Sequence, residues 1–270
     1  MSLRVTNNAQ IERSIYDINA SGARLQRTQQ DISTGMRLHR PSDDPTANAR
    51  AMVLKTSMAQ NEQYTKNIQA TANFVQVTDT ATTGYINALQ RLRNLAVQGA
   101  SGNLRSEDKG AIAQEVMQIR EEIRTIGNSQ YNGRYIFGGF KTDTPPYPAD
   151  LSFATDDQGK LNTEIAPGIT VNYNVNGTSL FGPVAQGVAG SIFGTIDTFN
   201  GFLGDATSTD DISKNTIAEL DGWLKKAGQS RTDLGGLTNR LDLASQRFSE
   251  VNTDLETLLN QTEATDIASA

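Results

Sequence analysis

Cysteine is absent from this chain of 270 residues, and histidine and tryptophan occur once each. The lack of cysteine excludes disulfides, thiolate nucleophiles and thiolate metal ligands. A single histidine excludes His-rich zinc sites and argues against a histidine-based catalytic triad. No apolar run approaches the ~20 residues that a membrane-spanning helix needs, and the N-terminus lacks the apolar core of a cleavable secretion signal. We therefore expect no membrane partner.

Positive charge is also scarce, because 24 basic side chains stand against 30 acidic ones and give a formal net charge of −6. An acidic chain without a basic block is a poor ligand for nucleic acid. The arginines are distributed unevenly, since six of them fall within the first forty residues. The remainder of the chain is correspondingly more acidic.

Candidate catalytic groups are few. His39 stands alone between two arginines, and we expect it to be an exposed loop residue rather than a catalytic one, which would need an oriented partner. Asp43 and Asp44 could be compared with the carboxylate pair of a glycosidase, but neighbouring aspartates at a predicted helix start are better explained as caps. The other acidic clusters lack the spacing of a calcium loop. The sequence therefore predicts no enzyme, no metal and no cofactor.

The first forty residues carry apolar side chains at alternating steps of four and three. This heptad spacing is typical of a helix that buries one narrow stripe against a partner helix. Gly22 and Gln29 interrupt the stripe, and its surroundings are polar, so the helix is marginal on its own. We call its apolar members the seam: Ile11, Ile15, Ile18, Leu25 and Ile32.

A motif rich in proline and aspartate then breaks the helical pattern. It reads Arg40-Pro41-Ser42-Asp43-Asp44-Pro45. Pro41 disfavours helical backbone at the residue before it. Ser42 or either aspartate can cap a new helix, and Pro45 suits the first turn. We call this the helix-start motif and predict a long helix after it.

The apolar spacing indicates helices over 45–98 and 106–128, a shorter one at about 190–203, and a last helix that opens at Asp210-Asp211 and continues to the chain end. Matching 3.5-residue periods predict that the long helices pair as a coiled-coil-like bundle. The predicted core residues of this rod are Leu89, Leu92, Leu234, Leu237, Leu241, Phe248, Val251 and Leu255.

Residues 131–187 follow a different pattern, with dense turn signals. Apolar and polar residues alternate from 169 to 176, as in a half-buried strand. Residues 151–155 and 161–165 flank a turn and predict a hairpin. The predicted fold class is therefore mainly α: a long antiparallel helical rod with a small all-β domain inserted in the middle.

Three stretches resemble the bacterial flagellin family. Residues 32–45 are similar to the first bend of flagellins, and residues 89–98 to the matching helix end. The run YNGRYIFGGFKTDTPPY at 131–147, together with the helix-start motif, resembles a narrower group in the family, the proteins that join the flagellar hook to the filament. The resemblance covers residues 1–147 and 186–270 and is specific as a set of motifs.

The resemblance implies a structural adaptor of the hook–filament junction that polymerises by helical packing and templates filament assembly. The seam would pair with the chain's own C-terminal segment and with neighbouring subunits. The implied partners are copies of itself, hook-associated protein 1 on the hook side, flagellin on the filament side and a flagellar export chaperone. The implied destination is the extracellular flagellum, reached through the flagellar type III apparatus.

The same resemblance implies a division of the chain. Residues 1–40 would be an N-terminal helical assembly segment, and residues 141–187 the small β domain. Residues 41–140 and 188–266 would form the rod together with a β-hairpin, and 267–270 would start a truncated C-terminal assembly segment.

A further implied feature is a contact face for an innate immune receptor at Arg91, Leu95 and Glu115, although Asn94 replaces an acidic residue there. Two alternatives to the junction role stay open. One is a filament flagellin. The other is a surface carbohydrate-binding or hydrolytic module in residues 141–187, which carry Tyr147 and Tyr173 for sugar stacking.

Overall fold

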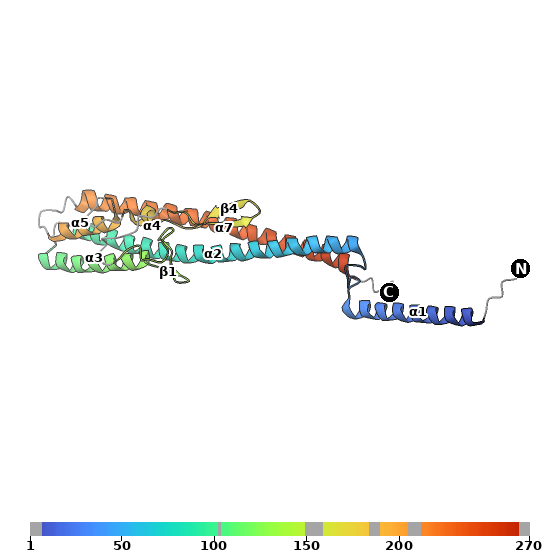
Figure 1. The fold of residues 1–270 in the computed structure, drawn as a ribbon. Coiled ribbons are helices and arrows are strands. Elements are labelled where there is room, and N and C mark those ends of the chain that lie inside the picture. The colour runs from blue at the N-terminus through green and yellow to red at the C-terminus, as the bar shows by residue number, and fades with distance from the viewer. Residues whose placement is uncertain (1–6, 102–103, 149–158, 184–189, 205–211, 265–270) are drawn as a thin grey trace. The chain divides into compact units, whose positions relative to one another are not determined.

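The computed structural model describes residues 7–101, 104–148, 159–183, 190–204 and 212–264. Helices dominate these residues, which confirms the predicted fold class (Figure 1). The π-helix η1 (Ile212–Thr216) leads directly into the last α-helix. The α-helices are α1 (Asn7–Thr34), α2 (Pro45–Gly99), α3 (Ser106–Gly127), α4 (Gly177–Phe181), α5 (Ile192–Gly204) and α7 (Ile217–Glu263).

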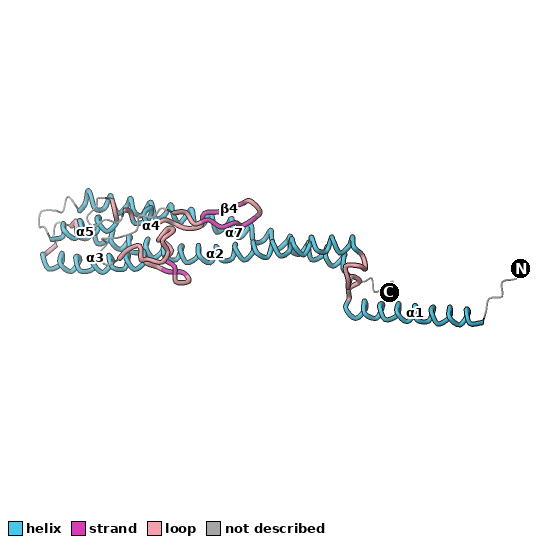
Figure 2. The backbone as a smooth tube through the Cα atoms, in the orientation of Figure 1, coloured by secondary structure: helices cyan, strands magenta, loops and turns pink. Residues whose placement is uncertain are grey.

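The described strands form two short antiparallel hairpins, which Figure 2 shows as small magenta segments among the helices. They are β1 (Gln130–Tyr131) with β2 (Arg134–Tyr135), and β3 (Asn162–Ala166) with β4 (Ile169–Asn172). The turn of the second hairpin contains Gly168 at φ +70°, a backbone conformation that glycine adopts without strain. The predicted hairpin partner at 151–155 lies outside the described residues.

The chain divides into two compact units, residues 1–63 with 247–270 and residues 64–246. We call them unit 1 and unit 2. The limits of the units fall inside α2 and α7, because each long helix is continuous and contributes to both units. The predicted domain limits near 40, 140 and 187 stay a prediction.

In unit 2, α2 and α7 run antiparallel. Nε of Arg93 lies 2.6 Å from Oδ1 of Asp221, and Nε of Arg231 lies 3.4 Å from Oδ1 of Asp79, so later residues of α2 meet earlier residues of α7. The helices α3 and α5 contact each other and lie beside this pair (Figure 1).

Buried threonines are part of the packed face of α2. Thr71, Thr78 and Thr82 are each at most 5% exposed. Their hydroxyls donate to the carbonyls four residues earlier, at 2.8, 2.9 and 2.8 Å. Because these bonds satisfy the hydroxyls within the helix, a threonine can occupy a buried position of α2 without leaving an unpaired polar group in the core.

The described part of residues 141–187 packs against the helices of unit 2. It contains one hairpin and the short helix α4, and its large side chains Tyr147, Leu180 and Phe181 are at most 1% exposed and belong to the core of the helices. Gly127 of α3 makes room for this packing, since an added Cβ would lie 2.5 Å from the Tyr147 ring. A short segment with few strands gains more by burying aromatics between helices than by forming its own core.

The predicted core residues of α7 divide between the two units. In unit 2, Leu234 and Leu241 are buried and Leu237 is half-buried, and Leu89 and Leu92 of α2 are fully buried. In unit 1, Phe248 and Leu255 are half-buried, and Val251 is 36% exposed, so its assignment to the core is wrong. In unit 2 the side chains of α3 and α5 pack against α2 and α7 and bury their apolar residues. In unit 1 α7 pairs along one side with α2, so its residues are less buried.

Candidate assembly surface

The seam of α1 is an uncovered apolar surface. Its five side chains are between 49% (Ile32) and 69% (Ile18) exposed. From residue 10 to the end of α1, no described side chain is buried, and just Ala20, Thr28 and Asp31 are half-buried. Burying one such apolar side chain contributes about 1.5–3 kcal/mol. The stripe therefore favours binding to another apolar helix face.

The end of α1 is fixed by local chemistry. The Thr34 hydroxyl donates to the Gln30 carbonyl at 2.9 Å and lies 3.3 Å from the backbone nitrogen of Met36. Gly35 follows with φ +70°. A left-handed residue directly after a helix is a common stop signal. We call residues 35–44 the corner, because they join α1 to α2.

Asp44 is the cap that starts α2. Its Oδ1 accepts the backbone N–H of Thr46 at 3.0 Å and of Ala47 at 2.9 Å, and Pro45 is the first helical residue. The sequence left Ser42, Asp43 and Asp44 open as caps. The structure selects Asp44, because its side chain reaches the free N–H groups of the first turn.

Asp43 instead organises the corner. Its Oδ2 accepts the N–H of Arg40 at 2.9 Å and of His39 at 3.3 Å, and its Oδ1 lies 2.6 Å from a guanidinium nitrogen of Arg27 on α1. The Arg40 N–H is the largest cause that lowers the pKa of Asp43; Arg27 and the His39 N–H lower it further, and partial burial opposes them. The carboxylate is therefore held in its charged form.

His39 is not the exposed loop residue that the sequence predicts. Its side chain is 18% exposed, and its Nε2 lies 2.8 Å from Oδ1 of Asp31 on α1. Asp31 and Arg27 were not predicted as site residues from the sequence. Their spacing of four residues on one helix face was the available signal.

The corner also contacts the end of α7. The Arg37 N–H donates to the Glu263 carbonyl at 2.8 Å, and Arg37 Nε donates to the Thr262 carbonyl at 3.2 Å. Lys55 of α2 pairs with the Glu263 carboxylate at 2.6 Å. These bonds satisfy carbonyls that the end of a helix leaves free. Three helices of unit 1 are thus tied together by polar groups at one place.

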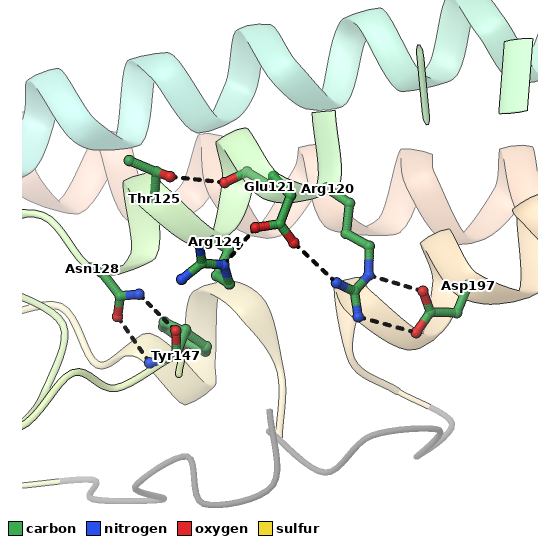
Figure 3. Close-up of polar contacts among 7 residues, drawn as sticks. All are labelled: Arg120, Glu121, Arg124, Thr125, Asn128, Tyr147 and Asp197. Carbon is green, nitrogen blue, oxygen red and sulfur yellow. Dashed lines mark hydrogen bonds and ion pairs between the residues drawn. The ribbon is translucent and has the colours of Figure 1, made fainter. Parts of the chain in front are cut away.

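Unit 2 holds a second polar cluster, which is structural. Arg120 is 8% exposed and points from α3 to Asp197 on α5, with Nε and Nη2 2.9 and 3.5 Å from the two carboxylate oxygens (Figure 3). Its Nη1 lies 3.3 Å from Glu121, which also binds Arg124 at 2.8 Å. Directly after α3, Asn128 exchanges two hydrogen bonds with the backbone of Tyr147, at 2.6 and 2.9 Å. A buried arginine needs such partners to avoid a large desolvation cost.

Among the described residues, no group of three or more acidic or histidine side chains is placed to hold a metal ion. The helices of the described ranges include none that is long and apolar enough to cross a membrane.

Comparison with known protein families matches residues 5–142 to the bacterial flagellin N-terminal helical region. The chain belongs to the bacterial flagellin family. The match includes α1, the corner, α2 and α3, so the seam and the helix-start motif both lie within it. Proteins of this family are structural components of the flagellum, which is assembled outside the cell from exported subunits.

The individual relatives include both hook-associated proteins and flagellins. Flagellar hook-associated protein 3 of Escherichia coli is 25% identical over 269 residues, which cover 98% of this chain and 82% of that protein. A flagellin of Bacillus subtilis is 24% identical over 277 aligned residues, which cover 98% and 88%. The structure of a flagellar hook-associated protein of Vibrio parahaemolyticus shares the fold, with a TM-score of 0.75 and 21% identity over 82% of this chain and all of that one.

The predicted receptor face of this flagellin-family chain is not assembled as expected. Arg91 and Glu115 do meet, with Nε 2.6 Å from Oε1; Arg91 is exposed and Glu115 is half-buried. Leu95 is 2% exposed and belongs to the core, so it cannot contribute to a surface contact. It lies on the side of α2 that also buries Leu92 and Ala96, because positions three and four apart share a helix face.

Proposed function

We propose that this flagellin-family protein is a structural adaptor at the hook–filament junction, which polymerises by helical packing and templates the filament. The observation that carries the proposal is the seam, five apolar side chains on α1 that are about half or more exposed in the isolated chain. The junction rather than the filament is supported by the 131–147 run and by the relative named hook-associated protein 3.

The partners follow from this role. The seam of residues 1–40 would pack against copies of the same chain, with hook-associated protein 1 on the hook side and flagellin on the filament side. An export chaperone would accompany the chain to the flagellar type III apparatus. The work of the protein is packing, without catalysis, metal or cofactor.

Deleting the gene in its own bacterium tests the proposal against the filament flagellin. Loss of a junction adaptor leaves the hooks bare while unpolymerised flagellin accumulates in the culture supernatant. Loss of the filament flagellin leaves no flagellin to secrete. Electron microscopy of the cells, together with immunoblots of the supernatant, separates these outcomes, and complementation with the intact gene is the control.

A carbohydrate-binding module in residues 141–187 has less support. Tyr147 is 1% exposed, and the ring of Tyr173 packs edge-on against Phe74 with centroids 5.0 Å apart. Both tyrosines that could stack on a sugar therefore take part in the packing of unit 2.

A further inference from the structure

The attachment of α1 to the rest of unit 1 is polar. From residue 10 onward its described side chains are exposed or half-buried, so apolar packing gives it little hold within the free chain. Beyond the Thr34 hydroxyl at the helix end, two polar side-chain contacts reach from α1 to the corner. They are the ion pair of Arg27 with Asp43 at 2.6 Å and the hydrogen bond between Asp31 Oδ1 and His39 Nε2 at 2.8 Å.

The two pairs are built as a unit. Arg27 and Asp31 are four residues apart and therefore share one face of α1. Arg27 contacts Asp43 of the corner, and Asp31 contacts His39. Asp43 and His39 are themselves joined, because the Asp43 carboxylate accepts the backbone N–H of His39. Three of the four side chains are less than 20% exposed, and Arg27 is 57% exposed. Of the two side chains on α1, Arg27 is a cation and Asp31 is an anion.

We infer that the pairs Arg27–Asp43 and Asp31–His39 form a salt-sensitive clasp that sets the direction in which α1 leaves the corner. Gly35 is the pivot when the clasp opens. It has φ +70°, and an added Cβ would meet nothing within 4 Å, so the backbone there can turn without a steric barrier from neighbours. The clasp presents the seam in one direction before any partner binds.

The energetics favour a clasp that opens and closes. Ion pairs near the surface contribute little each and weaken as salt screens them, with a Debye length of about 10 Å at 0.1 M and about 3 Å at 1 M. The direction of α1 is thus biased in the free chain, and assembly contacts along the seam can still override it. The inference concerns the free chain and does not depend on the proposed junction role.

The absence of cysteine makes a direct test simple. Spin labels on Ser21→Cys in α1 and Gln60→Cys in α2, both exposed positions of unit 1, report the distance between the helices in the full chain. In about 20 mM NaCl we expect one dominant distance. In 1 M NaCl, or in the variant Arg27→Gln/Asp31→Asn, the ratio of that population to the others should fall roughly three- to tenfold. Salt should have little further effect on the variant.

The matched control is Asp17→Asn/Arg24→Gln, which also neutralises one aspartate and one arginine of α1 but at positions further from the corner. It should keep the low-salt distance distribution of the parent. A dominant distance that neither salt nor the clasp variant changes would overturn the inference, as would a low-salt distribution already as broad as that of the variant. The salt series uses the parent chain and remains decisive if the variant misfolds.

Discussion

Asn128 shows how single polar residues hold this structure together. It follows α3 and binds both the carbonyl and the N–H of Tyr147, nineteen residues later. The Tyr147 ring then fills the space that Gly127 leaves open and packs on Phe181 at a centroid distance of 5.1 Å. One amide thus anchors the loop that closes one side of the core.

Replacing Asn128 by Ala should destabilise unit 2 by about 2–3 kcal/mol, because two hydrogen bonds are lost and two backbone groups of a half-buried loop lose their partners. Urea unfolding followed by circular dichroism measures the change. The control is Asn239→Ala at an exposed position of α7, which should change stability by less than about 0.5 kcal/mol. Equal effects for the two variants would contradict the anchoring role.

The lowered pKa of Asp43 predicts how the corner responds to acid. Its pKa lies below the ordinary value of 3.8 in the folded chain, so the carboxylate stabilises the corner fully above about pH 4 and loses that effect as the pH falls through the lowered pKa. The amide signals of Arg40 and His39 in NMR spectra should therefore titrate with a midpoint below 3.8. Asp43→Asn should abolish this titration, and a midpoint at or above 3.8 would show that the N–H groups do not hold the charged form.

At the scale of elements, α1 and the long helices play different parts. The core residues of unit 2 come from α2 to α7, whereas α1 offers the seam and little buried surface. The buried core therefore resides in α2 to α7, and we propose that the capacity to assemble resides in α1.

Deleting residues 1–34 should shift the melting temperature by less than about 2 °C, because few described side chains of α1 are even half-buried. Calorimetry of the shortened and the full chain checks this. The shortened chain should also fail to join the flagellum, as should Ile15→Gln/Leu25→Gln in the full chain. A drop in melting temperature above about 5 °C would mean that α1 is part of the stabilising core.

The helices could be predicted from the sequence because their apolar residues repeat locally. The limits 45–98 and 106–128 differ by about one residue from α2 (Pro45–Gly99) and α3 (Ser106–Gly127). The seam could be located for the same reason. Its role in assembly is still a prediction.

The contacts of the corner and of residues 141–187 could not be predicted in this way. Arg37 binds a carbonyl 225 residues away, and Tyr147 fills a space that Gly127 creates, so neither partner follows from a local period. Val251 was misplaced because a period identifies a helix face but does not tell how many neighbours cover it. The number of neighbours depends on tertiary packing. Leu95 was placed on a surface by the family resemblance and is buried in this chain.

At the scale of the whole molecule, membership of the flagellin family and the uncovered seam support a subunit that is completed by its neighbours. An exposed apolar stripe of this kind is a liability in a protein that stays alone and a binding surface in one that polymerises. The missing cysteine suits a chain that travels to its assembly site before it packs.

Immunogold electron microscopy of flagella that carry an epitope-tagged, functional copy of this chain tests the junction role most directly. We predict one cluster of gold at the boundary between hook and filament on each flagellum. Cells with the untagged gene provide the background. Gold distributed along the filament would contradict the account and identify the chain as a filament flagellin.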